Sequence, residues 1–214
     1  MLNIAPPMEE QKKDIIDSAL AMFNRYGIRS VTMDDLANEL RVSKKTLYKF
    51  FDNKADLVHH CGKLLFNRIY ERMVQVHEQS DDAIDELFEM DKVVWEMMEK
   101  HNPSMRYQVQ KYYPKTHQHL FEGRREMIQK MIRENIERGK RDGLFRDDAD
   151  TQVVSFLYCS KMETMPEEEA EFMDRHSLRY ISRQALVYHI RGLATEQGLA
   201  KLEEKLKTYK IDED

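Results

Sequence analysis

Three helix-start signals in close succession constrain this chain more than any other feature of its sequence. Thr32 stands three residues before Asp35, Asn53 stands three residues before Asp56, and Ser43 lies between the two pairs. Ser, Thr and Asn side chains accept hydrogen bonds from the free N–H groups at a helix start, and an acidic residue three positions later completes a capping box. The sequence therefore predicts short helices that begin near Thr32 and Ser43, and a further helix that begins near Asn53.

An amphipathic helix is predicted upstream of these signals, from about Glu10 to Tyr26. Gly27 follows it directly, which is the usual left-handed stop. Apolar residues at helical spacing form the inner face of this helix: Ile15, Ile16, Ala19, Leu20 and Phe23. The next two helices turn further apolar residues inward, with Arg41 and Val42 in the tight turn between them: Leu36, Ala37, Leu40 and Leu47. Three short helices in this order form the helix-turn-helix pattern.

The distribution of charge singles out the segment that follows Leu40. The whole chain has a net charge of -5, whereas its first 60 residues carry nine basic and nine acidic residues. Between Arg41 and Lys54, five basic residues meet only one acidic residue, Asp52. A short basic element on a neutral module, attached to an acidic body, is the pattern of a local nucleic-acid contact.

The residues that carry these signals resemble the N-terminal domain of the TetR family of repressors. The similar residues extend from about Gln11 to Leu65 and include the run 19–23, Tyr26-Gly27, Thr32, Leu36-Ala37, Val42-Ser43, Thr46-Leu47-Tyr48, Phe51, Lys54 and Leu57. The resemblance implies a transcriptional regulator that binds double-stranded operator DNA, a repressor that leaves a palindromic operator when a small-molecule effector binds.

The second helix of a helix-turn-helix lies in the major groove, where its N-terminal residues contact base edges. Lys44, Lys45 and Thr46, followed by Tyr48 and Lys49, are therefore the expected DNA-reading residues. We expect Thr32, at a helix N-terminus, to offer its hydroxyl and nearby N–H groups to phosphate. Lys54 resembles the phosphate-binding lysine of the family.

Two residues depart from the family pattern. Arg41 stands in the turn where the family usually has Gly, so we expect either a strained turn or an added phosphate contact. Asp34 stands where many relatives carry a basic or neutral residue that contacts bases. A carboxylate there either accepts from cytosine N4 or points away from the DNA.

Few residues that interrupt helices are present, since only 7 Gly and 5 Pro occur in 214 residues. We expect an all-α fold with a helix-turn-helix DNA-binding domain at residues 1–56 and a larger helical effector-binding and dimerisation domain at residues 57–214. Periodicity and caps predict helices in the larger domain over residues 57–76, from Ser80-Asp81-Asp82 onward, between Pro103 and Pro114, and over 115–141, 147–165, 177–194 and 199–209.

Two segments of the larger domain are apolar on more than one face, residues 153–159 and 185–193. A helix that is buried on two sides needs a core on one side and a second partner on the other. In the TetR family the last two main helices pair with their copies in a four-helix interface. We therefore expect a homodimer through the helices that contain Leu157 and Leu186. Central burial within a monomer is the alternative.

Two charged residues interrupt predicted apolar stripes and mark a candidate effector pocket. Asp91 lies among the apolar residues of its helix, and Arg124 lies on the stripe that includes Phe121. A charge on a buried face is costly unless it is paired. These two residues, with Trp95, Met98 and Phe121, are predicted to bind a small apolar or amphipathic effector. An Asp91–Arg124 structural pair, or a helix rotated so that Met90 faces inward and Asp91 outward, explains the same pattern.

The sequence contains no phosphate loop, nucleophile elbow or metalloprotease motif, so we expect no enzyme activity and no cofactor. The histidines are scattered along the sequence and predict no metal site: His59, His60, His117 and His119. Cys61 and Cys159 lack redox or zinc spacing and suit a reducing compartment. No signal peptide or membrane-length apolar run is apparent, which predicts a cytoplasmic protein without membrane contact. A ligand-independent or architectural DNA-binding protein is the alternative function, although an architectural protein should carry basic charge across its body.

Overall fold

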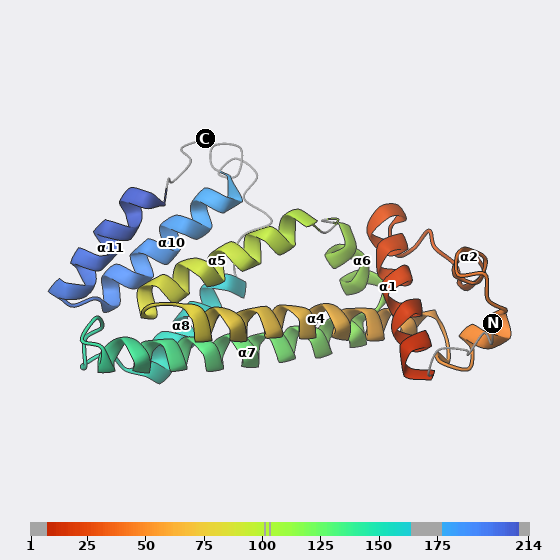
Figure 1. The fold of residues 1–214 in the computed structure, drawn as a ribbon, viewed down its shortest axis with the longest axis horizontal. Coiled ribbons are helices and arrows are strands. Elements are labelled where there is room, and N and C mark those ends of the chain that lie inside the picture. Colours follow the sequence, from red (N-terminus) through yellow and green to blue (C-terminus); the bar gives the residue numbers. More distant parts are fainter. Residues whose placement is uncertain (1–7, 101, 103, 164–176, 210–214) are drawn as a thin grey trace, which may run out of the picture. The chain divides into compact units, whose positions relative to one another are not determined.

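The computed structural model describes residues 8–100, 102, 104–163 and 177–209, with the side chains of 161–163 excluded. Within these ranges the regular elements are helices, and one isolated β-bridge joins Phe145 to Ala194. The all-α prediction is confirmed. The helices are α1 (Met8–Tyr26), α2 (Met33–Glu39), α3 (Lys44–Leu47), α4 (Lys54–Gln79), α5 (Ala83–Lys100), α6 (Ser104–Tyr112), α7 (Pro114–Arg141), α8 (Thr151–Glu163), α10 (Leu178–Leu193) and α11 (Glu196–Thr208) (Figure 1).

These helices form two compact units. The N-terminal unit comprises Met1–Tyr70 and Met97–Gly123, and the C-terminal unit comprises Glu71–Glu96 and Arg124–Asp214. Helices α4, α5 and α7 contribute residues to both units. The predicted functional boundary between residues 56 and 57 falls within the first turn of α4 and stays a prediction.

The three predicted helix starts in the N-terminal unit are confirmed. Thr32 Oγ1 accepts the N–H of Asp35 at 3.1 Å, and the Asp35 carboxylate accepts the N–H of Thr32 at 2.8 Å, which completes a capping box. Ser43 Oγ accepts the N–H of Thr46 at 3.1 Å, and Asn53 Oδ1 accepts the N–H of Asp56 at 3.0 Å. Each side chain satisfies an N–H group that the helix itself leaves unpaired.

The core of the N-terminal unit contains the apolar residues that the sequence placed inward. Ile15, Ala19 and Phe23 of α1 pack with Leu36 of α2 and Leu47 of α3, and each of these side chains is at most 1% exposed. Burial of Leu47 sets the orientation of α3, which is only four residues long. The single buried leucine and the Ser43 cap therefore fix which side chains of α3 face solvent.

The turn between α2 and α3 contains a strained arginine. Arg41 has a φ of 53°, in the left-handed region that disfavours residues other than Gly. Its N–H donates to Asn38 O at 3.2 Å, and the N–H of Val42 donates to Ala37 O at 3.0 Å. This pair of bonds is the Schellman helix end, whose left-handed residue is usually Gly.

Replacing Arg41 with Gly is therefore expected to stabilise the protein. Gly removes the left-handed strain, and after the larger entropy loss of Gly is subtracted we expect a gain of about 0.5–1 kcal/mol in the free energy of unfolding. Urea denaturation measures this change. Arg41→Ala is the matched control, because it removes the charge and keeps the strain; an equal gain in both variants would contradict the backbone explanation.

Helix starts in the C-terminal unit refine the predicted bounds. The helix predicted from residue 147 begins at Thr151, because Asp150 Oδ1 accepts the N–H groups of Gln152 and Val153 at 2.9 and 3.0 Å. Its predicted end at 165 lies outside the described residues. Helix α11 begins at Glu196, three residues before the predicted start, because Thr195 caps it.

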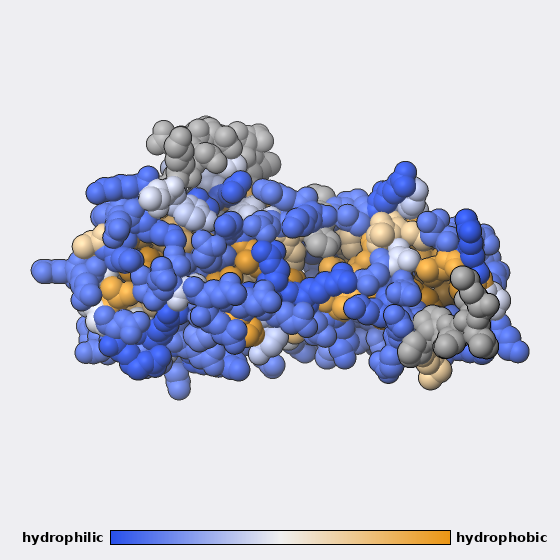
Figure 2. All heavy atoms as spheres, viewed as in Figure 1, coloured by the Kyte–Doolittle hydropathy of each residue, from blue (hydrophilic) through white to orange (hydrophobic). Residues whose placement is uncertain are grey.

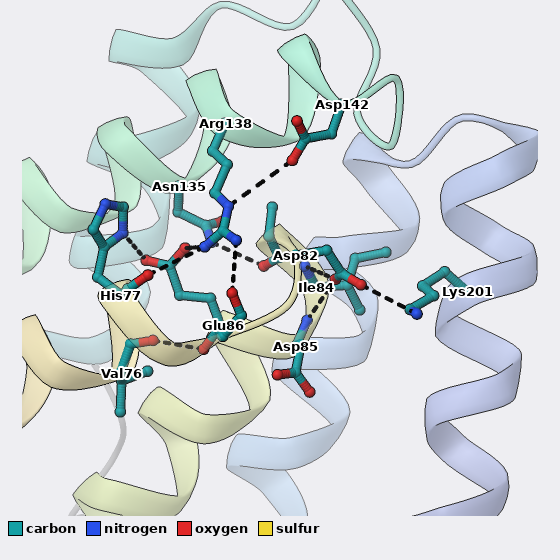
Figure 3. A network of polar contacts seen from close by, with 12 residues as sticks. Val76, His77, Asp82, Ile84, Asp85, Glu86, Asn135, Arg138, Asp142 and Lys201 are labelled. Carbon is teal, nitrogen blue, oxygen red and sulfur yellow. Dashed lines mark hydrogen bonds and ion pairs between the residues drawn. The ribbon is translucent and has the colours of Figure 1, made fainter.

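A buried polar network holds three helices of the C-terminal unit together (Figure 3). The Glu86 carboxylate on α5 is fully buried and accepts from His77 Nδ1 of α4 at 2.7 Å and from Arg138 Nη1 of α7 at 3.3 Å. Arg138 also donates to the carbonyl oxygens of His77 at 3.3 Å and Ser80 at 2.7 Å, near the end of α4. The guanidinium thus pairs a buried charge and satisfies two backbone acceptors.

Hydrophilic residues cover most of the face seen in Figure 2, with apolar patches between them. This agrees with the 34% of residues that are charged. Within the described ranges, no helix combines the length and apolar character needed to cross a membrane.

Candidate nucleic-acid interface

Helix α3 and the two residues that follow it include most of the residues that the sequence analysis assigned to DNA. Lys44, Lys45, Tyr48 and Lys49 are exposed. Thr46 is only half-exposed, and its Oγ1 lies 2.8 Å from Ser43 Oγ. Thr46 is therefore part of the helix cap, whereas the three lysines and the tyrosine face solvent.

The three lysines have different surroundings. Lys44 Nζ lies 2.6 Å from Asp34 Oδ2 in the first turn of α2, and this hydrogen bond raises the pKa of Lys44. In the described part of the chain, Lys45 and Lys49 have no carboxylate within ion-pair distance. Lys45 and Lys49 are thus available to bind phosphate, whereas the charge of Lys44 is already paired with the Asp34 carboxylate.

Thr32 lies at the predicted N-terminus but is occupied internally. Its hydroxyl donates to Asp35 Oδ2 at 2.7 Å, and its N–H donates to the same oxygen. These hydrogen bonds lower the pKa of Asp35. A phosphate contact by Thr32 requires the hydroxyl to leave Asp35, so its predicted DNA role stays a prediction.

Lys54 begins α4 and is partly buried. Its Nζ donates to the carbonyl oxygen of Arg29 at 3.4 Å. Burial lowers the pKa of Lys54, and the Asp35 carboxylate opposes that shift. The ammonium therefore lies beside the chain that leads into α2, and its phosphate-binding role stays a prediction.

Contacts between α6 and the loop after α1 were not predicted. Gln108 Oε1 accepts the N–H of Arg29 at 2.9 Å, and Tyr112 Oη accepts from Arg29 Nη1 at 3.2 Å. The guanidinium also lies 5.4 Å from the centre of the Tyr112 ring, within cation–π range. Arg29 thus connects α6 to Lys54, and no local sequence pattern could reveal this because the partners are about 80 residues apart.

Among the candidate effector residues, Asp91 is paired with a cation that the sequence analysis did not consider. Asp91 is buried and pairs with Arg183 of α10 at 3.2 Å, and the two side chains are 8% and 6% exposed. The sequence had left open an Asp91–Arg124 pair or a rotated helix; the structure instead pairs Asp91 with Arg183, and Met90 and Asp91 both face inward. Packing of α10 on α5 supplies the cation that pairs with Asp91.

Trp95 lies beside this pair, because its indole N–H donates to Asp91 Oδ1 at 3.2 Å. Met98 is 41% exposed, and the ring of Phe121 stacks against His117 with 6.1 Å between the centroids. Asp91, Trp95 and Arg124 belong to the C-terminal unit, whereas Met98 and Phe121 belong to the N-terminal unit. A shared pocket for the five residues stays a prediction.

An open cavity of about 490 Å³ lies within the C-terminal unit. It contains none of the five candidate effector residues. Its lining is polar and charged: His77, Arg133, Glu134, Glu137, Arg141, Thr151 and Gln152.

Histidines that are scattered in the sequence come together in the N-terminal unit. The ring centroids of His59 and His119 lie 5.2 Å apart. Burial lowers the pKa of His59, and the nearby charge of His119 lowers it further. Within the described ranges, no group of three or more potential metal ligands is found.

Helices α8 and α10 each bury one face and expose another. Val153, Phe156 and Leu157 of α8 are 48–58% exposed, and Tyr188 of α10 is 82% exposed. Leu186, which marked α10 in the prediction, is itself only 2% exposed and lies in the core. The apolar run therefore includes both a core face and an outward face, and the outward faces are available to a partner.

Residues 15–61 match the family model described as "Bacterial regulatory proteins, tetR family". The N-terminal unit therefore contains a segment that is similar to the N-terminal domain of TetR-family regulators. The biofilm operon icaADBC HTH-type negative transcriptional regulator IcaR of Staphylococcus aureus (strain Newman) is 30% identical over 78 residues. That alignment covers 36% of this chain and 42% of the relative, so the match spans less than half the length of IcaR.

Solved structures share the fold over nearly the whole chain. A transcriptional regulator from Cytophaga hutchinsonii aligns with a TM-score of 0.71 and 16% identity, over 86% of this chain and 99% of that one. A putative transcriptional regulator from Saccharomonospora viridis, solved in complex with choline, aligns with a TM-score of 0.58 and 19% identity, over 88% and 100%. At these identities the similarity establishes the fold alone. The segment that matches the family model thus belongs to an all-helical fold that these solved structures share.

Proposed function

We propose that this protein is a sequence-specific transcriptional repressor that binds a palindromic operator as a homodimer and leaves it when a small molecule binds. The observation that carries the proposal is the exposed lysine surface of α3 on a TetR-type domain. The name of IcaR as a negative regulator supports repression, and the choline complex of a structural neighbour supports an effector.

Selection of duplexes from a random library by the purified protein tests DNA recognition. We expect enrichment of an inverted repeat, since the two recognition helices of a dimer read half-sites about one helical turn, or a multiple of it, apart. A gel shift with the enriched duplex should survive excess random DNA. Complete competition would instead favour an architectural DNA-binding protein.

The combined substitution of Lys45 and Lys49 by Ala is expected to weaken DNA binding. Each lysine that neutralises a phosphate contributes about 0.9 to the slope of log K against log salt, so the slope should fall by roughly two for each protomer. We expect about 10- to 100-fold lower affinity for the operator at moderate salt. Fluorescence anisotropy over a salt series measures both quantities.

Lys130→Ala with Lys207→Ala provides the matched control, because both lysines belong to the C-terminal unit and the change in net charge is the same. Operator binding that is unchanged in the Lys45 and Lys49 variant would remove α3 from the interface.

The Asp91–Trp95 pair offers a test of the effector site. Trp95 is the only tryptophan of the chain, so its fluorescence reports directly on the surroundings of Asp91. A compound that raises the melting temperature and releases the operator should change this fluorescence. With Asp91→Asn or Trp95→Phe we expect its affinity to fall about 10-fold, within the coupling typical of such switches.

Glu89→Gln, on the same helix, is the control for this experiment because Glu89 pairs with the exposed Lys92 at 3.5 Å. If Asp91→Asn and Trp95→Phe both bind the compound and release DNA as the native protein does, the effector site lies elsewhere.

A further inference from the structure

An ion pair with Asp34 distinguishes Lys44 from the neighbouring lysines, Lys45 and Lys49. Its two side chains are 54% and 59% exposed, with 2.6 Å between Oδ2 and Nζ. Asp34 lies in the first turn of α2, which the capping box fixes, and Lys44 is the first residue of α3, which Ser43 caps. The donor and the acceptor are therefore presented side by side from two capped helix starts.

Neither stability nor phosphate binding accounts for this pair. An exposed ion pair contributes about 0–1 kcal/mol to folding. A carboxylate on a surface that approaches DNA repels the phosphates, and it cancels the charge that Lys44 would otherwise bring to them. Lys45 and Lys49 carry no such partner among the described residues. The pair suits a target that offers an acceptor and a donor close together.

The major-groove edge of a G·C base pair is such a target. Guanine presents the acceptors O6 and N7, and cytosine presents the N4 amino group as a donor. Guanine O6 and cytosine N4 hydrogen-bond to each other at about 3 Å, which is close to the separation of Nζ and Oδ2 in the ion pair. The ammonium can therefore donate to O6 and N7 while the carboxylate accepts from N4.

An A·T base pair fits less well. Adenine N6 can donate to the carboxylate, but the two acceptors of A·T, adenine N7 and thymine O4, lie on opposite sides of N6 and not side by side as guanine N7 and O6 do. Lys44 then loses the second acceptor that guanine provides. A·T therefore pairs with fewer donors of this surface than G·C does.

We infer that Asp34 and Lys44 read one G·C base pair in each operator half-site as a unit, which makes Asp34 a specificity-determining residue. This inference rests on the proposed function, because it requires that the protein bind an operator with α3 in the major groove. On the DNA, the carboxylate rejects partners that cannot donate to it. Asp34 thus contributes discrimination rather than affinity.

The test compares duplexes selected from one random library by the full-length native protein, by Asp34→Asn and by Glu39→Gln. Glu39 is the matched control because it is an exposed carboxylate at the other end of α2, so both variants lose the same charge. Native-like melting temperatures establish that the variants fold. Affinities are then measured on the enriched operator and on a copy in which the assigned G·C pair is replaced by A·T.

We expect one G·C position in each half-site that the native protein and Glu39→Gln select and that Asp34→Asn does not. The replacement by A·T should weaken native binding about 10- to 100-fold. It should weaken Asp34→Asn less than about 3-fold, because an Asn side chain favours adenine.

Identical base preferences in native protein and Asp34→Asn would overturn the inference, as would a changed position that is not G·C. The same holds if Glu39→Gln loses the same preference, since the effect would then be one of net charge. Failure of the native protein to enrich any sequence would overturn the proposed function itself, and the inference with it.

Discussion

Replacing Leu157 with Glu is expected to convert the protein to a monomer and to weaken operator binding by more than about 100-fold. A dimer holds two DNA-binding domains on one operator, and linking two binding modules typically raises the affinity by at least that factor. The reason is the outward face of α8, where Val153, Phe156 and Leu157 form an exposed apolar stripe at helical spacing. Burial of that stripe against a second copy stabilises a dimer through the hydrophobic effect. A carboxylate placed there must be desolvated without a partner, at a cost of several kcal/mol.

Sedimentation measures the oligomeric state and fluorescence anisotropy measures operator affinity. Leu199→Glu is the matched control, because Leu199 is an exposed leucine of α11, 38% exposed, outside the proposed interface. Leu186 is unsuitable as a probe since its side chain is buried in the core. A native protein that sediments as a monomer at micromolar concentration would contradict the proposed dimer.

Replacing Arg138 with Met is expected to lower the free energy of unfolding by about 3–5 kcal/mol, the usual effect of leaving one partner of a buried ion pair behind. Glu86 is fully buried, and His77 would be its remaining polar contact among those described. The carbonyl oxygens of His77 and Ser80 also lose the guanidinium N–H groups (Figure 3). Urea denaturation measures the loss.

Arg141→Met is the control for this prediction, since Arg141 is an exposed arginine on the same helix. Glu86→Gln should recover part of the loss in the Arg138→Met background, because the buried charge is then absent. If the free energy of unfolding falls by less than about 1 kcal/mol, which is what a surface ion pair contributes, water has replaced Arg138.

The sequence predicted helices α1 to α3 and the start of α4 accurately because their determinants are local. Each cap joins residues three positions apart, and the stop at Gly27 depends on one left-handed residue, whose φ is 82°. The sequence predicted either a strained turn or an added phosphate contact at Arg41, and the strain could be anticipated because it too depends on one residue. Local rules of this kind do not require knowledge of the tertiary fold.

Contacts between distant residues account for what the sequence could not predict. The stripe on α5 located Asp91 as a buried charge, but it could not show that Arg183, 92 residues later, supplies the counter-charge. The apolar run of α10 could not show that Leu186 packs in the core while Tyr188 faces outward, since apolar residues lie on more than one face. The link from α6 through Arg29 to Lys54 had no sequence pattern at all.

The shortness of α3 has a consequence for attempts to transfer this DNA recognition to another scaffold. A helix of four residues cannot pay the nucleation cost of its first turn alone, so a peptide of residues 43–49 should be unstructured in water. The shape of the proposed DNA-contacting surface is instead produced by the Ser43 cap, the buried Leu47 and the capped start of α2. The smallest portable reading module is therefore the whole helical domain, and exchanging α3 side chains within it is the practical route to a new operator.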